Sequence, residues 1–483
     1  MALPKVQPES QSSLDGPSPP VIHIPPEVRR SDKVNEAYSQ ALDQYGPVII
    51  VPRHGRDEYV VDHRYTRQVL TDTENFTFEK AIFDFLHLGF LAPFDNGMYV
   101  RNIDSLIENN VQPRMSAIID RIFPAFQEYF DQLARELPNP ADDKTPMEFP
   151  DAFSLLQKAI AHAMVVMTLG PAYSSSVAAG QFAAVAVAMA HMGGMHENTH
   201  EWVWFPSLWI LLNGLWAIFV IIIPHFFISI VPMLWKTRHQ HLTNGLAAHH
   251  GEYVPLFDVL LVKYYYEKTG FRALAGFTWS VILCVGMIFA SIHQTAVAST
   301  WILAKLAEKQ DEYLPAIREE WDTIAPSSEP LNVKKLCQLT LLDSFIREVF
   351  RTKGDTWGPI RQTTRPVRIG PYVIPTKSFC LVLVSRVHQH PDNYGSDGKA
   401  FDGFQWQRKG YAAVQSNTEF LPFGLGRWTC PGRQLAVHEI KIMLYLLFSK
   451  FDIRIKEGSF RVINTINTTS TPPEVTLLLR RRL

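Results

Sequence analysis

Residues 423–432 read FGLGRWTCPG, and the apolar-rich run RQLAVHEIKIMLYLLF follows directly. The glycines of this stretch allow a tight turn and the close approach of a flat ligand. Pro431 suits the first position of a helix, because its missing N–H costs nothing there. Free N–H groups and the positive end of the dipole at a helix start stabilise a thiolate. The stretch therefore predicts a turn that brings Cys430 to a helix start, either as a metal ligand or as an ordinary buried cysteine at a cap.

The other cysteines and the overall charge exclude several classes of protein. Cys284, Cys337 and Cys380 are scattered and form no C-x-x-C pair with Cys430, so neither a disulfide framework nor a structural zinc site is expected. The formal net charge is -1 at pH 7, and the only basic run is the terminal RRR at residues 480–482. No nucleic-acid partner is predicted, because phosphate binding needs a clustered excess of Lys and Arg.

The chain is predicted to be mainly α with small β-sheets, in one domain over residues 31–483. Residues 1–30 are rich in proline and lack the apolar core of a signal or anchor, so they are expected to form a disordered or loosely ordered arm. Alternating patterns predict a β-hairpin over residues 46–62 and short strands over 368–374 and 378–384. Helical periodicity is found over residues 118–133, 152–169, 334–351 and 434–448.

Two long apolar stretches need different explanations. Residues 202–223 carry no charge, are long enough to cross a bilayer and have aromatic residues at their ends. We expect the apolar block 202–235 to contact a membrane, by spanning or by shallow insertion, and the alternative is a buried helix pair broken at Pro224. Residues 273–304 are also uncharged, but their Ser, His, Gln and Thr side chains are costly in lipid. A central buried helix that lines a cavity explains them better.

The cysteine stretch resembles the heme-binding loop of cytochromes P450, which has the pattern F-x-x-G-x-(R or H)-x-C-x-G. Phe423, Gly426, Cys430 and Gly432 match this pattern. The resemblance extends from the predicted hairpin at Gly46 to the helix after Cys430, and so covers most of the chain. It implies the cytochrome P450 fold and a heme cofactor, iron protoporphyrin IX, whose iron is bound by the Cys430 thiolate.

An E-x-x-R pair on an upstream helix is a second feature of that family. Glu348 and Arg351 match it and lie on one face of the predicted helix. The resemblance implies that they form a structural pair that locks the core beneath the heme. The family completes this network with an arginine in a segment like F-D-G-F-R-F, whereas residues 401–406 read FDGFQW here. Gln405 can still form hydrogen bonds, and Arg408 is a nearby substitute.

The heme propionates of the family are bound by cationic side chains, and the resemblance implies candidates here. Arg361 stands where the propionate arginine usually falls, and Arg365 is a close rival. In the cysteine loop the position that is usually Arg or His is Trp428, which can donate only its indole N–H. The neighbouring Arg427 is therefore also expected to bind the cofactor.

The oxygen-side helix of the family has the pattern (A or G)-G-x-(D or E)-T-(T or S), and residues 290–295 read ASIHQT here. His293 in the acid position resembles a fungal secondary-metabolism branch with ent-kaurene-oxidase-like members, whose version reads AAIHTT. Gln294 stands where the relay threonine is expected, and glutamine is a poor proton donor. The predicted catalytic residues are His293, Gln294 and Thr295, and the alternative for His293 is a hydrogen-bonded core histidine.

The resemblance implies a monooxygenase that hydroxylates a lipophilic small molecule, a terpenoid or another fungal secondary metabolite. It implies electrons from NADPH–cytochrome P450 reductase, with cytochrome b5 as a further candidate partner. The expected location is the endoplasmic reticulum membrane, with the catalytic domain facing the cytosol. The family's usual N-terminal membrane anchor is not recognised in this sequence, and block 202–235 is expected to replace it in part. Gln294 leaves open a heme-thiolate isomerase, dehydratase or ring-coupling enzyme without net oxygen insertion. The apolar stretches leave open a membrane binding or transport protein.

Overall fold

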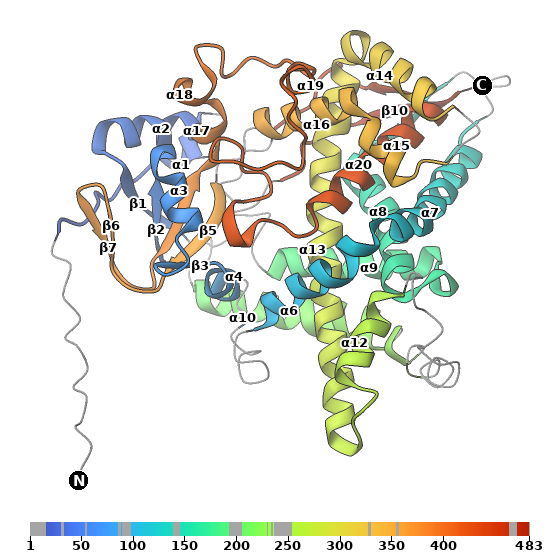
Figure 1. The fold of residues 1–483 in the computed structure, drawn as a ribbon, viewed down its shortest axis with the longest axis horizontal. Coiled ribbons are helices and arrows are strands. Elements are labelled where there is room, and N and C mark those ends of the chain that lie inside the picture. Colours follow the sequence, from blue (N-terminus) through green and yellow to red (C-terminus); the bar gives the residue numbers. More distant parts are fainter. Residues whose placement is uncertain are drawn as a thin grey trace.

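Helices make up most of the chain that the computed structural model describes (Figure 1). It describes residues 16–29, 33–53, 56–85, 88, 98–138, 145–192, 205–228, 230–232, 235, 254–326, 330–353, 357–462 and 471–482. The largest sheet lies at one edge of a helical body, and helix α13 (Gly270–Glu308) runs through the middle of that body. The mainly helical architecture with small sheets agrees with the predicted fold class.

Helix α13 forms the centre of the hydrophobic core. Val281, Ile288 and Ile302 on this helix have no exposed surface. A helix that is apolar on all sides has to be surrounded by other elements. The neighbours of α13 include α8 (Ala152–Leu169), α9 (Ser176–Met192), α16 (Thr340–Thr352) and α20 (Arg433–Lys450). The predicted central buried helix over residues 273–304 is therefore confirmed for most of its length, while Leu274, Ala275 and Thr278 near its start are exposed.

The described residues form three small sheets beside the helices. The largest has the strand order β1-β2-β8-β5-β3, in which β2 and β8 run parallel and the other neighbours run antiparallel. In it, Val48 of β1 lies opposite Val61 of β2, which confirms the predicted hairpin. The other two sheets have the orders β4-β10-β9 and β6-β7. The strands are β1 (Val48–Arg53), β2 (Arg56–Val61), β3 (Phe76–Thr77), β4 (Met147–Phe149), β5 (Trp357–Thr363), β6 (Val367–Ile369), β7 (Tyr372–Ile374), β8 (Phe379–Leu383), β9 (Phe451–Ile455) and β10 (Leu477–Arg481).

The remaining helical elements connect these sheets and pack around α13. They are α1 (Pro26–Arg29), α2 (Val34–Tyr45), η1 (His63–Tyr65), α3 (Thr66–Thr71), α4 (Glu79–Phe85), α6 (Tyr99–Leu106), η3 (Ile107–Val111), η4 (Gln112–Arg114), α7 (Met115–Glu136), η5 (Pro171–Tyr173), α10 (Pro206–Trp216), η7 (Ala217–Ile228), α12 (Leu256–Tyr264), α14 (Gln310–Ile324), α15 (Val333–Gln338), α17 (Val384–Gln389), α18 (Pro391–Tyr394), α19 (Gln405–Lys409) and η9 (Gly426–Trp428).

The helix predicted over residues 334–351 is divided into α15 and α16. The division lies at Leu339, and the Glu320 carboxylate of α14 lies at the start of α16. It accepts the backbone N–H of Leu341 at 2.7 Å and that of Leu342 at 3.2 Å. A carboxylate at a helix N-terminus satisfies donors that have no partner within the helix. This contact between distant segments explains why periodicity alone missed the break.

The N-terminal arm is ordered where it is described, so the prediction of a loose arm over residues 1–30 is wrong for residues 16–29. The N–H of Ile22 donates to Ile50 at 2.8 Å, and Val21 pairs with Ile50 in a parallel bridge. The N–H of Val373 donates to Pro17 at 3.1 Å. Prolines are tolerated at a sheet edge, where no N–H is needed. Residues 1–15 lie outside the described part.

Three described helices are long and apolar enough to cross a membrane: Ala152–Leu169, Leu211–Pro232 and Gly270–Glu308. The three helices differ in how much of their most apolar part is buried. The most apolar part of the first is 78% buried and that of the third 56%, because both belong to the core around α13. For Leu211–Pro232 the value is only 20%. This helix continues through Pro224, so the alternative of a buried pair broken there is wrong. Residues 202–204, 229, 233 and 234 lie outside the described part of the block.

Candidate functional site

The loop that carries Cys430 is a tight turn, and a backbone hydrogen bond joins its two ends. The Cys430 N–H donates to the Phe423 carbonyl at 2.8 Å. Gly424 and Gly426 have φ values of +72° and +74°, which only glycine adopts without strain. A Cβ at Gly426 would lie 3.0 Å from the Leu70 carbonyl oxygen. The glycines are therefore needed both for the turn and for its contact with α3.

Two side chains hold the end of the loop where it enters α20. Gln112 donates from Nε2 to the Pro431 carbonyl at 2.9 Å, and Arg433 donates from Nη1 to the Cys430 carbonyl at 2.8 Å. Gly432 directly precedes α20, and a Cβ there would lie 3.9 Å from the Cys430 Sγ. The predicted placement of Cys430 just before a helix is therefore confirmed.

The protein environment alone does not ionise the Cys430 thiol to a thiolate. Burial raises its pKa, and the N–H groups of Gly432 and Arg433 lower it only in part. Helix-start donors were expected to stabilise a thiolate, and desolvation outweighs them here. A bound metal cation deprotonates a coordinating thiol outright. The site is therefore suited to a cysteine that becomes a thiolate when it binds a metal.

A cavity of about 470 Å³ lies between the cysteine loop and α13. Cys430 and Phe423 line it from the loop side. Apolar side chains from α4, α6, α8 and α13 supply most of the remaining wall, and they include Ile82, Phe85, Ile103, Met167, Met287 and Ala298. Apolar walls with a few polar groups are typical of a site for a small lipophilic molecule.

The predicted distal residues divide between two faces of α13. Gln294 and Thr295 line the cavity opposite Cys430. His293 is fully buried and is not among the cavity-lining residues, and its ring meets that of Phe153 on α8 at 5.5 Å between centroids. Successive helical residues point in different directions, so the three cannot all face one cavity. The structure brings two of the predicted distal residues together with Cys430 and places the third in the helix packing.

Arg361 and its rivals for anion binding lie in different environments. Arg361 on β5 lines the cavity, is only 1% exposed, and its Nε has no hydrogen-bond partner. Burial lowers its pKa to about 10, so it remains a cation at neutral pH. Arg365 lies at the surface, where it pairs with Glu74 at 2.9 Å. Arg427 is exposed and outside the cavity wall, with its guanidinium 5.9 Å from the Trp428 ring centroid.

Glu348 and Arg351 form a fully buried ion pair beside the site. Arg351 donates to the two carboxylate oxygens of Glu348 at 2.7 and 2.9 Å. It also donates to the carbonyls of His388, Gly398 and Ala400. A buried pair needs such additional hydrogen bonds, because desolvation otherwise exceeds the Coulomb attraction. The pair therefore ties α16 to the segment that leads toward the cysteine loop.

The third member of this network is Trp406, which sequence reasoning missed. Its indole N–H donates to Glu348 Oε2 at 2.8 Å, and the ring is buried. Gln405 instead accepts from Lys409 at 2.7 Å, and Arg408 pairs with Asp402. The expectation for Gln405 or Arg408 is therefore wrong. Gln405 begins the short helix α19, which carries the next side chain, Trp406, toward α16, and no periodic pattern signals this turn.

Two carboxyl groups in the cavity wall were also missed. Burial, followed by repulsion from Glu108 and Glu79, raises the pKa of Asp104 on α6 to about 6. Burial raises the pKa of Glu439 on α20 to about 8. A lone acid within the apolar run after Cys430 was a usable signal for Glu439, whereas nothing in the local sequence marks Asp104.

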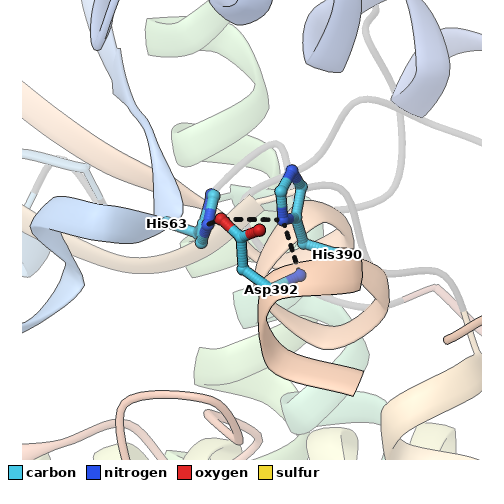
Figure 2. Close-up of side chains that lie close together, drawn as sticks. All are labelled: His63, His390 and Asp392. Carbon is cyan, nitrogen blue, oxygen red and sulfur yellow. Dashed lines mark hydrogen bonds and ion pairs between the residues drawn. The ribbon is translucent and has the colours of Figure 1, made fainter. Parts of the chain in front are cut away.

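His63, His390 and Asp392 form a cluster of side chains outside the wall of this cavity (Figure 2). Asp392 Oδ2 lies 3.2 Å from His63 Nε2 and 3.4 Å from His390 Nδ1. The two rings are stacked, with centroids 4.0 Å apart and planes 29° apart. Imidazole lone pairs lie in the ring plane, so stacked rings direct them into separate planes. The cluster therefore joins η1 to α18 by hydrogen bonds.

A family model for cytochrome P450 matches residues 15–479. The chain belongs to the cytochrome P450 family. The P450 monooxygenase phqO of Penicillium fellutanum is 30% identical over 224 residues, which are 44% of this chain and 51% of that protein. Abscisic acid 8'-hydroxylase 1 of Arabidopsis thaliana is 32% identical over 170 residues, 35% of each chain. The matched region therefore spans only about a half and about a third of these two relatives.

The fold of this P450 is similar to that of a solved structure across almost its entire length. Retinoic acid-bound cyanobacterial CYP120A1 superposes with a TM-score of 0.69, covering 97% of this chain and 100% of that chain at 16% identity. This likeness shows the fold. A membrane binding or transport protein without a cofactor is not supported, because the chain is a P450 and two of its three long apolar helices belong to the core.

Heme is the cofactor of P450s, and the residues in the cavity fit it. Cys430 offers a thiol from a loop whose glycines leave room for a flat ligand. Arg361 is a buried cation in the same wall with one N–H unpaired, which is the donor that an anionic propionate needs. Apolar side chains supply most of the remaining wall. Cys430 would hold the iron, and Arg361 would hold a propionate.

Proposed function

We propose that this P450 is a heme-thiolate monooxygenase that oxidises a lipophilic small molecule with O2 and electrons from a reductase. The observation that carries the proposal is the shared cavity of Cys430, Gln294 and Thr295. A metal-ligating thiol lies on one side and two hydrogen-bonding side chains lie on the other, within walls that are otherwise mostly apolar. Bound heme supplies the oxygen activation, and the protein supplies binding, orientation and electrostatics.

Four residues at or next to the cavity, Thr295, Gln294, His293 and Arg361, then each have a role. Thr295 can hold a proton at Oγ1, and Gln294 can orient a water molecule, because an amide accepts and donates hydrogen bonds but does not ionise. His293 supports this pair through its packing against Phe153. The apolar side chains exclude water and orient the substrate. Arg361 neutralises anionic charge at the edge of the cavity.

The substrate class follows from the cavity wall and from the branch that the sequence resembles. The wall is mostly apolar, which favours a hydrophobic compound with few polar groups. The resemblance to ent-kaurene-oxidase-like fungal enzymes favours a terpenoid or another secondary metabolite. NADPH–cytochrome P450 reductase is the proposed electron donor, with cytochrome b5 as a second candidate.

Contact with the endoplasmic reticulum membrane is part of the proposal, with the catalytic domain in the cytosol. The apolar helix formed by α10 and η7 exposes Leu211, Trp216 and Phe219 at 57%, 47% and 61%. Large apolar side chains exposed on one element mark an interaction site when they form a contiguous patch. A Trp216→Ser, Phe219→Ser double variant is expected to bind vesicles more weakly than wild type in flotation. Unchanged flotation would contradict the role of this helix.

Gln294 gives a specific reason to keep a second function, a heme-thiolate isomerase, dehydratase or ring-coupling enzyme. It lines the cavity where a relay threonine is expected, and an amide is a poor proton donor. The test is incubation with fungal terpenoid extracts, reductase, NADPH and ¹⁸O2. A monooxygenase gives products with one ¹⁸O atom and requires reductase. Conversion without reductase or label would favour the second function.

A further inference from the structure

Helices α12 and α13 form a finger that projects past the helices around it (Figure 1). We define the finger as residues 262–274. Its two helices cross closely at Gly276, where a Cβ would overlap the Tyr264 carbonyl oxygen. Ser280 Oγ also hydrogen-bonds the Leu260 carbonyl at 3.3 Å. These contacts at the base fix the finger in place without covering its tip.

The tip of the finger exposes large apolar side chains. Phe271 is 84% exposed, more than any other large apolar residue in the described part of the chain. Leu274 lies one turn further along α13 and is 53% exposed, and Val262 on α12 is 45% exposed. The transfer of an exposed phenylalanine side chain from water into an apolar phase is favourable, because it removes apolar surface from water.

The charged residues next to these exposed apolar side chains indicate what kind of surface the finger would bind. Residues 263–274 contain the cations Lys263, Lys268 and Arg272 and a single acid, Glu267. Tyr264, Tyr265 and Tyr266 lie at the end of α12 and directly after it, and each is half-buried. Apolar residues, interfacial tyrosines and an excess of cations are the features of a surface that enters anionic lipid headgroups.

The finger is also continuous with the apolar helix of α10 and η7. Trp235, which follows η7, meets the Phe277 ring at 5.0 Å and the Tyr265 ring at 6.1 Å between centroids. The two apolar surfaces are therefore joined through aromatic contacts. One bilayer can engage both of them.

We propose that the finger is a second membrane contact, which places Phe271, Leu274 and Val262 at the boundary between headgroups and acyl chains of an anionic bilayer. The inference rests on the membrane contact proposed above for α10 and η7. The finger would be a membrane contact separate from α10 and η7. It would prefer anionic lipids, because Lys263, Lys268 and Arg272 lie on it.

Flotation of the full-length, heme-loaded protein on phosphatidylcholine vesicles, with and without phosphatidylserine, tests the proposal. A Phe271→Glu, Leu274→Glu variant should bind both kinds of vesicle at least about tenfold more weakly. A Lys268→Gln, Arg272→Gln variant should lose about tenfold of the preference for phosphatidylserine and keep its binding to phosphatidylcholine. The matched control is Val462→Glu, at a site 44% exposed in the loop after β9, and should bind like wild type.

The outcomes separate the finger from the helix of α10 and η7. Wild-type binding by Phe271→Glu, Leu274→Glu, together with weak binding by Trp216→Ser, Phe219→Ser, would overturn the finger and leave the first contact standing. No vesicle binding by the wild type would overturn both. A wild-type dimer in light scattering that the finger variant converts to monomer, with unchanged vesicle binding, would assign the surface to self-association instead.

Discussion

At the scale of single residues, the site consists of polar groups held in a low-dielectric cavity. Burial shifts the pKa of each of these groups, and the direction of the shift depends on whether the charged form is a cation or an anion. It lowers the pKa of the Arg361 guanidinium and raises those of Cys430, Asp104 and Glu439. Burial disfavours the charged form of every group. The cavity therefore favours ligands that bring a counter-charge for Arg361 and a metal for Cys430.

Arg361→Gln should weaken heme binding by about tenfold or more, because a charge-assisted hydrogen bond to a propionate contributes about 1.5–3 kcal/mol. The measurement is heme content after purification and the affinity of refilled apoprotein. Arg365→Gln removes an arginine from the surface and serves as the control, with no loss expected. Equal losses in the two variants would show that Arg361 has no special role.

Asp104 gives a pH-dependent prediction. Its folded-state pKa of about 6 exceeds its ordinary value of 3.8, so the folded chain binds more protons than the unfolded chain between these values. Stability therefore falls as the pH rises from about 4 to about 6. Asp104→Asn should unfold at higher urea than wild type above about pH 6, by on the order of 2 kcal/mol, with the difference vanishing below about pH 4. Asp311→Asn, at an exposed carboxylate, should show no such dependence, and a pH-independent effect of Asp104→Asn would contradict the assignment.

At the scale of elements, the cysteine loop and the ion-pair network depend on contacts between distant segments. Gly426 and Gly410 have almost the same φ, +74° and +73°. A Cβ at Gly426 would lie 3.0 Å from the Leu70 carbonyl oxygen, whereas nothing lies within 4 Å at Gly410. The two positions share a positive φ, which would strain any other residue, and differ in the contact with α3.

Gly410→Ala should cost about 1 kcal/mol from backbone strain alone, and Gly426→Ala about 2–3 kcal/mol because the loop also has to move away from α3. Urea unfolding measures the two losses, and heme content should fall only for Gly426→Ala. Equal losses with full heme content would show that the contact with Leu70 does not position the loop.

The network around Glu348 predicts which neighbour matters. Trp406→Phe should destabilise the protein by about 1–3 kcal/mol, because it removes a hydrogen bond to a buried carboxylate. Gln405→Ala and Arg408→Ala should each change the free energy of unfolding by less than about 0.5 kcal/mol. A larger loss for either of them than for Trp406→Phe in urea unfolding would restore the expectation drawn from the family pattern.

Local patterns predicted the elements well, and contacts across the chain explain the failures. The hairpin of β1 and β2, the long α13 and the helix after Cys430 follow from alternation and apolar periodicity. The break before α16, the pairing of residues 17–22 with β1 and β7, and the role of Trp406 depend on partners far away in sequence. At the site, a motif located Cys430, but only the structure shows that His293 faces Phe153.

At the scale of the whole molecule, the P450 fold encloses a core helix and leaves two apolar surfaces outside. The cavity lies between α13 and the cysteine loop, while α10, η7 and the finger expose apolar side chains to the surroundings. A lipophilic substrate partitions into a bilayer. A protein held at the bilayer by these surfaces would meet such a substrate in the phase in which the substrate accumulates.

The central claim is that Cys430 ligates a heme iron, and the carbon monoxide difference spectrum of the reduced protein tests it most directly. The wild type should show the strongly red-shifted Soret band of thiolate-ligated iron. Cys430→Ala should lose this band, while Cys337→Ala, at an exposed cysteine, should keep it. A wild-type protein that carries no heme, or a red-shifted band that persists in Cys430→Ala, would contradict the account.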